Sequence, residues 1–77
     1  MIPMPNLQPG DLVILLSVPS SLISGLPEDD QAAIRSAIGK TVKFSGVSYN
    51  NQAEVEFRDS HGGIHTIWVD TDRIRPA

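Results

Sequence analysis

The sequence predicts a mainly β fold, in which five strands curl into a small barrel and one helix lies in the first long connection. Three observations support this prediction. Apolar and polar residues alternate through much of the second half of the chain, as in strands with one buried face. Only the segment 27–38 carries clear helix start and stop signals. The 77 residues, 40% of them hydrophobic, suffice for one small domain with a thin core.

The beginning of the chain is rich in proline. Three of the six prolines lie within the first ten residues, where they exclude a helix or a central strand because proline fixes φ and lacks an N–H. We therefore expect an extended lead-in over residues 1–8 and a single domain over residues 9–77. The first strand is predicted at 12–16. Its apolar run does not alternate, so we expect the helix or a partner chain to cover its second face.

The next segment, 17–26, has the serines, proline and glycine of a loop. Its apolar content is unusual for a loop, because it includes Val18, Leu22, Ile23 and Leu26. Two interpretations are open. These side chains pack back onto the core, which is the interpretation we favour, or they form a patch for a partner.

The helix is predicted to begin at Pro27, a residue suited to the first helical position because its missing N–H would have no acceptor there. Three acidic residues follow and complement the positive end of the helix dipole. Gly39 can adopt the left-handed conformation that ends a helix. Ile34 and Ile38, four residues apart, predict a narrow apolar stripe on one side.

The remaining segments read as strands joined by turns. We predict strands at 41–47, 53–57 and 64–69, a one-turn helix at 70–72 and a short last strand at 73–75. Gly46 suggests a bulge in the first of these strands. The segments 49–52 and 59–63 have the asparagine and glycine residues typical of turns.

The position of Trp68 depends on how the hairpin strands pair, because a slip of one residue exchanges the two faces. One pairing places Trp68 over Ala53 inside the core. The other places Val55 opposite Ile67 and leaves Trp68 beside Glu54 on the outer face, with better apolar matches. An outer Trp68 would be covered by the chain's own helix or lead-in, or it would anchor an interface; both alternatives are open.

This order of elements resembles the Src-homology-3-like small barrel, the superfold of the KOW and Tudor domains. The resemblance spans about residues 9–76. It rests on Pro9-Gly10-Asp11-Leu12-Val13, on the glycine-turned hairpin 56–69, and on 70–74 as turn plus last strand. It implies a barrel with a long first connection and a 3-10 turn before the last strand. The helix departs from the signalling versions, and the superfold by itself carries no activity.

Composition excludes several classes of function. Nine acidic against six basic side chains give a net charge of −3, the wrong sign for a protein that neutralises phosphates. The absence of cysteine excludes disulfides, a thiol nucleophile and cysteine-built metal sites. No apolar run is long enough to span a membrane, and the first residues do not resemble a secretory signal. We therefore expect a cytoplasmic protein.

Polar clusters give little sign of catalysis. Asp59, His61 and His65 could ligate zinc, but we interpret them as a polar turn plus one strand histidine. Glu54 and Glu56 point the same way along a strand, as on a solvated face. No serine lies in a nucleophile elbow, and no glycine-rich phosphate loop is present. We expect no enzyme activity, no metal and no cofactor.

The sequence thus predicts a non-catalytic protein-interaction module, with a homo-oligomer as one form of it. Trp68 and Tyr49 are the rings that the alternation does not place in the core. The candidate interaction residues are Trp68, Tyr49, Leu22 and Ile23.

Two alternatives remain. The first is a KOW-like nucleic-acid-binding barrel that uses Arg58, Arg73 and Arg75 near one end, although acidic residues are interleaved with them. The second is remote and comes from a resemblance to the type II dihydrofolate reductases, oligomeric enzymes of this architecture. Thr66-Ile67-Trp68 is similar to their Gln-Ile-Tyr run, but the threonine lacks the amide that would hold the ligands.

Overall fold

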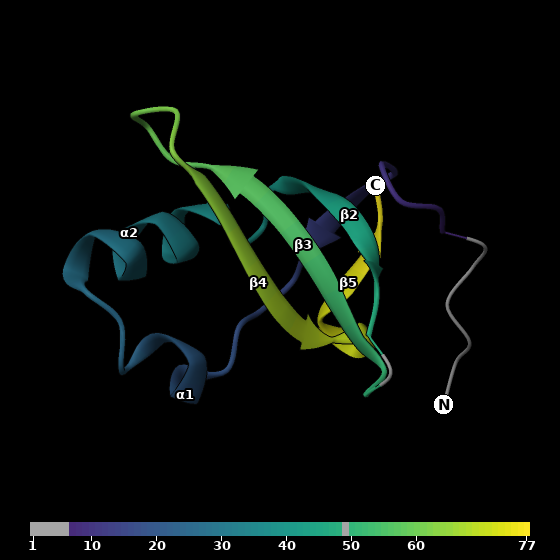
Figure 1. Cartoon of the computed structure of the whole chain (residues 1–77), viewed down its shortest axis with the longest axis horizontal. Coiled ribbons are helices and arrows are strands. Elements are labelled where there is room, and N and C mark those ends of the chain that lie inside the picture. The colour runs from purple at the N-terminus through teal and green to yellow at the C-terminus, as the bar shows by residue number, and fades with distance from the viewer. Residues whose placement is uncertain (1–6, 49) are drawn as a thin grey trace.

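The computed structural model describes residues 7–48 and 50–77, which form a five-stranded antiparallel sheet with two helices after the first strand (Figure 1). The elements are β1 (Leu12–Leu15), α1 (Ser20–Ile23), α2 (Glu28–Ala37), β2 (Thr41–Val47), β3 (Gln52–Arg58), β4 (Ile64–Asp70), the 3-10 turn η1 (Thr71–Arg73) and β5 (Ile74–Pro76). The strand order is β4-β3-β2-β1-β5. Within the described ranges, no helix has the length and apolar character needed to cross a bilayer.

The predicted alternation in β2, β3 and β4 is confirmed, because every second side chain of these strands points into one core. The buried strand residues are Val42, Phe44, Ala53, Val55, Phe57, Ile67 and Val69. The predicted bulge is also present, since the pairing of β2 with β3 shifts between Phe44 and Gly46. Gly46 has φ 147°, a backbone conformation that side chains disfavour.

The register of the β3–β4 hairpin is the one with the five-residue loop. Val55 lies opposite Ile67, and Glu54 lies opposite Trp68. This register turns Val55, Ile67 and their alternate neighbours inward, so Trp68 faces outward with 48% of its surface exposed. The preference for this pairing on the basis of its apolar matches is confirmed.

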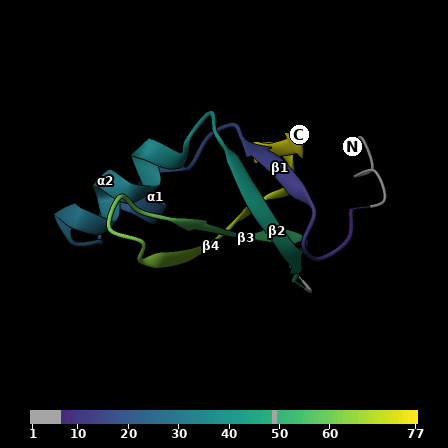
Figure 2. The ribbon, with the colours of Figure 1, turned by 90° about the horizontal axis from the view of Figure 1, so that it is seen from above.

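The sheet does not close into the predicted barrel. The edge strands β4 and β5 are each paired with a single neighbour and not with each other. Both helices lie beside the β4 side of the sheet (Figures 1 and 2). Ile23, Ile34 and Ala37 of these helices are buried in the same cluster as the strand side chains. The helices therefore fill the gap that a barrel would close with hydrogen bonds between its edges.

The first strand is covered on only one face within the described chain. Val13 and Leu15 are fully buried, whereas Leu12 is 57% exposed and Leu16, just after the strand, is also exposed. Of the two covers expected for its second face, cover by the helix is wrong, because the helices join the core on the side of Val13 and Leu15; cover by a partner chain stays a prediction. Although every residue of β1 is apolar, its side chains therefore alternate between buried and more exposed positions.

Both helices lie in the connection between β1 and β2, and both cover the core. The predicted helix 27–38 is confirmed as α2, with Pro27 as its N-cap, but Ile38 lies just beyond it and is 37% exposed. Its apolar stripe consists of Ile34 and Ala37 instead. The predicted loop 17–26 contains the short helix α1. Its apolar side chains pack against the core, as favoured: Ile23 is buried, and Val18, Leu22 and Leu26 are partly buried.

Asp59 holds the β3–β4 turn together. Its Oδ1 accepts hydrogen bonds from the backbone N–H groups of His61 (2.9 Å) and Gly63 (2.8 Å). Its Oδ2 lies 2.9 Å from Nε2 of His65, whose ring stacks on Phe57. These hydrogen bonds, the one to His65 first, favour the ionised carboxylate and lower the pKa of Asp59 from 3.8 to about 2.

We predict that Ile34→Ala lowers the free energy of unfolding by about 2–4 kcal/mol, because it leaves a cavity between α2 and the sheet. Chemical denaturation measures this loss. Ile38→Ala is the matched control, since the same substitution four residues later removes a partly exposed side chain and should cost clearly less. Equal losses in the two variants would contradict the placement of the helix.

We predict that Asp59 makes stability depend on pH. Because its pKa is lower in the folded chain, its contribution is complete above pH 3.8 and disappears as the pH falls toward 2. Asp59→Asn should therefore be less stable than the wild type at pH 6, and the difference should vanish near pH 2. Denaturation curves across this range test the prediction. Asp72→Asn, which removes an exposed carboxylate from η1, should leave the pH profile unchanged.

Candidate protein-interaction site

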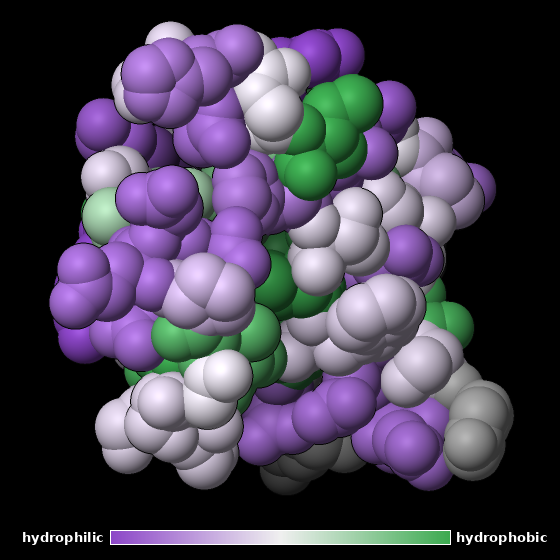
Figure 3. Space-filling view, turned by 60° about the vertical axis from the view of Figure 1, so that its left-hand side comes forward, coloured by the Kyte–Doolittle hydropathy of each residue, from purple (hydrophilic) through white to green (hydrophobic). Residues whose placement is uncertain are grey.

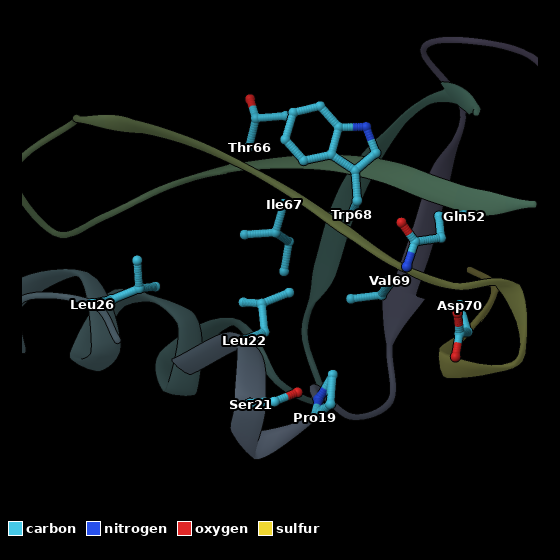
Figure 4. A pocket seen from close by; sticks show the side chains of 10 residues that line it. All are labelled: Pro19, Ser21, Leu22, Leu26, Gln52, Thr66, Ile67, Trp68, Val69 and Asp70. Carbon is cyan, nitrogen blue, oxygen red and sulfur yellow. The ribbon is translucent and has the colours of Figure 1, made fainter. Parts of the chain in front are cut away.

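A groove of about 500 Å³ runs along the edge of β4 that faces away from β3. One wall comes from α1 and the residues around it, with Pro19, Leu22 and Leu26. The other wall is β4 itself, with Thr66, Trp68 and Asp70 (Figure 4). Figure 3 shows this side of the molecule, where green apolar surface lies among mostly purple polar residues. The groove thus combines an apolar floor with a polar rim.

Trp68 stands at the outer rim of the groove. Its indole and the Thr66 side chain lie on one side of β4, whereas Leu22 and Ile67 lie on the other (Figure 4). With nearly half of its surface exposed, the indole is not covered by the chain's own helices. The other predicted cover is the lead-in, of which positions 1–6 lie outside the described residues. Trp68 is therefore a large exposed apolar surface next to a groove, as interface anchors are.

The hydrogen-bonding pattern of β4 follows from its turn. In an antiparallel pair, residues bonded to the neighbouring strand alternate with residues whose N–H and C=O point away from it. The N–H of Asp59 donates to the carbonyl of Gly63 at 2.9 Å, which makes these two a bonded pair. The register then continues without interruption to the end of β4. His65, Ile67 and Val69 are therefore the residues that bond to β3.

The other residues of β4 present their backbone to the groove. By the same alternation, the N–H and C=O groups of Thr66 and Trp68 point away from β3. Along 7–48 and 50–77, no backbone or side-chain partner outside the strand ladder bonds to these groups. The wall of the groove is thus an unpaired strand edge.

The two edges of the sheet differ in how well they are protected. Natural edge strands are usually short, or carry proline, lysine or a bulge, so that they do not pair with other chains. β5 has three residues, one of which is Pro76. β4 has seven residues and an uninterrupted register, without proline, lysine or arginine. Its edge has none of these protective features.

The rim of the groove carries negative charge. Glu54 lies opposite Trp68 on the outer face, and Asp70, two residues along β4, lines the groove itself (Figure 4). None of the ion pairs found in the described part of the chain involves either carboxylate. The residues lining the groove include Asp70 and no lysine or arginine. A positively charged group at this rim would therefore be attracted.

The structure brings some of the predicted interaction residues together. Trp68 and Leu22 line opposite walls of the same groove. Ile23 is buried in the core and does not reach this surface. Tyr49 lies outside the described residues. Leu26, which sequence reasoning placed only in a possible loop patch, also lines the groove. Sequence reasoning missed the free backbone of β4, because no sequence pattern states which strand lies at an edge.

The nucleic-acid alternative places three arginines near one end of the molecule, but the structure does not bring them together there. Arg58 ends β3 beside the hairpin turn, whereas Arg73 lies in η1, beyond the opposite end of β4. Six residues of strand separate these ends, which is roughly 20 Å. Arg73 also donates to Oγ of Ser17 at 2.9 Å, and Arg75 lies on β5.

The residues singled out for chemistry show no catalytic arrangement that we can identify. Asp59 is occupied in the turn, and His65 lies 3.8 Å from Asp30 of α2. Three or more possible ligands do not assemble into a metal site anywhere in the described ranges. In Thr66-Ile67-Trp68, the middle side chain is buried and the outer two lie at the groove.

Comparisons with protein-family models, curated proteins and solved structures find no match to this chain. No family is therefore identified. The chain is a small five-stranded antiparallel β-sheet protein, and its site is interpreted from its own residues.

We predict that the free edge of β4 is visible in amide hydrogen exchange. The amides of Thr66 and Trp68 should exchange much faster than those of Ile67 and Val69, because only the latter pair bonds to β3. Exchange followed by NMR resolves the four signals individually. If Trp68 is as protected as Val69, the edge is covered or the pairing differs from the one described.

Proposed function

We propose that this chain is a non-catalytic protein-interaction module and that its partner binds in the groove along β4. The observation that carries the proposal is the half-exposed Trp68 beside an apolar groove and an unpaired strand edge. Tryptophan is enriched among the few residues that dominate binding energy, since its large rigid ring loses little conformational entropy when it is covered.

The groove supplies the features that a tryptophan anchor needs. Leu22 and Leu26 offer apolar contact area on the far wall, and Thr66 and Asp70 offer polar contacts at the rim. Interfaces of this kind have an apolar centre surrounded by polar residues. A small domain without disulfides also benefits from a partner, because its own core is thin.

The fold suits this role without specifying it. We interpret it as an opened form of the Src-homology-3-like barrel, supported by the helix-bearing first connection and the 3-10 turn before the last strand. In this interpretation the helices replace one side of the barrel and leave β4 as the accessible edge. The nucleic-acid alternative lacks comparable support, because Arg58 is far from Arg73 and the net charge is −3.

Trp68→Ala tests the proposal. We expect the variant to lose affinity for its partner by about 30-fold or more, the cost of removing an interface anchor, while its unfolding midpoint stays close to that of the wild type. Leu12→Ala is the control, because Leu12 is a large apolar residue at least as exposed as Trp68 but lies on β1. Affinity capture and sedimentation of the three proteins provide the measurement.

The result is informative in either direction. Partner retention by the wild type and Leu12→Ala, with loss in Trp68→Ala, supports the site. An assembly state and a set of captured proteins that are the same for all three would show that Trp68 anchors nothing, and the proposed function would be abandoned.

A further inference from the structure

We propose that the groove binds an extended segment of a partner protein, which pairs with β4 as an antiparallel sixth strand and places a lysine or arginine beside Trp68. This inference rests on the proposed function and names the form of its partner. It combines three features of one surface: the unpaired backbone, the apolar floor and the acidic rim.

The backbone of β4 provides the first recognition element. The N–H and C=O groups of Thr66 and Trp68 point into the groove and are aligned as they are in a sheet. A strand lying about 4.8 Å away would satisfy all four groups. Recognition by strand addition takes its affinity from such main-chain bonds and its specificity from alternate side chains. The occupant is therefore extended rather than helical.

The apolar wall of the groove at α1 determines every second residue of the added strand. Side chains of neighbouring strands share their faces, so the residues that flank the one opposite Trp68 point inward. There they meet Leu22 and Leu26, which are only partly buried and stand across the groove from β4. Aliphatic side chains at these positions would remove both leucines from water.

The acidic rim determines the residue between them. The side chain directly opposite Trp68 lies on the outer face, where Glu54 lies opposite the indole on the other side, across the pairing of β4 with β3. A lysine or arginine at this position can stack on the indole and be attracted by the carboxylate of Glu54. An acidic side chain would be repelled, and no basic residue of the groove could compensate for it. The predicted segment thus reads aliphatic-basic-aliphatic.

A second copy of this chain fits the groove less well than a peptide segment. The β4 of a second copy has its own α1 on the far side of the same groove. If the β4 strands of two copies paired about a twofold axis, the α1 helix of each copy would overlap the other copy's sheet, at the place where its β3 adjoins its β4. A single extended segment avoids this overlap, because it brings no helix with it.

Titration with synthetic peptides tests the inference. The probe is the capped peptide Val-Thr-Val-Lys-Val-Thr-Val, and Val-Thr-Val-Glu-Val-Thr-Val is the comparison. Trp68 is the only tryptophan, so its fluorescence reports binding directly, and amide NMR shifts locate it. We expect the lysine peptide to bind at least about tenfold more tightly and to shift the amides of Thr66 and Trp68 most strongly.

Two further measurements distinguish strand pairing and charge recognition from nonspecific peptide binding. Methylation of the lysine backbone nitrogen should weaken binding at least about tenfold, because this N–H faces β4, whereas methylation at the adjacent valine should have little effect. Glu54→Gln should reduce the preference for lysine over glutamate. Glu28→Gln, the same change at the start of α2, should leave the preference unchanged.

Three outcomes would overturn the inference. They are equal binding of the two peptides, equal effects of the two methylations, and a concentration-dependent dimer that protects the amides of Thr66 and Trp68. The last would assign the edge to a second copy. If the peptides fail while affinity capture still depends on Trp68, the groove binds protein in another form. If both fail, the proposed function fails as well.

Discussion

The pairing of Val55 with Ile67 is the contact on which the second half of the molecule depends. Because side chains alternate along a strand, this one register decides the face of every residue in β3 and β4. It buries Ala53, Val55, Phe57, Ile67 and Val69 and exposes Trp68, which lies opposite Glu54. A shift of one residue would place Trp68 opposite Ala53 inside the core and turn Ile67 outward beside Glu54. The candidate site is thus a consequence of core packing.

The packing of the helices also explains why the edge of β4 is unpaired. They bury Ile34 and Ile23 against the inner face of the sheet beside β4, where a closed barrel would pair its edge strands. Burial of apolar surface takes the place of hydrogen bonds between edge strands there, and this leaves the edge of β4 that faces away from β3 without a paired strand. The stability of the core and the availability of the edge therefore have the same origin. The groove lies between the helix α1 and this unpaired edge of β4.

The hairpin turn keeps this edge in register. Asp59 accepts two backbone hydrogen bonds within the turn and contacts His65 at the beginning of β4. The turn thus fixes the loop at five residues and determines which backbone groups of β4 face the groove. At the opposite edge, β5 ends at Pro76 after three residues and offers few groups for pairing. Among the described residues, the edge of β4 is consequently the strand edge suited to recognition.

Local patterns in the sequence determined most of the elements. Alternation determined β2, β3 and β4, helix start and stop signals determined α2, and apolar matching identified the outward position of Trp68, because each depends on neighbours in the chain or across one turn. Tertiary structure alone decided that the sheet stays open, that Ile23 enters the core while Leu22 reaches the groove, and that Arg58 lies far from Arg73. These outcomes depend on how distant segments share a limited interior, and no local pattern carries that information.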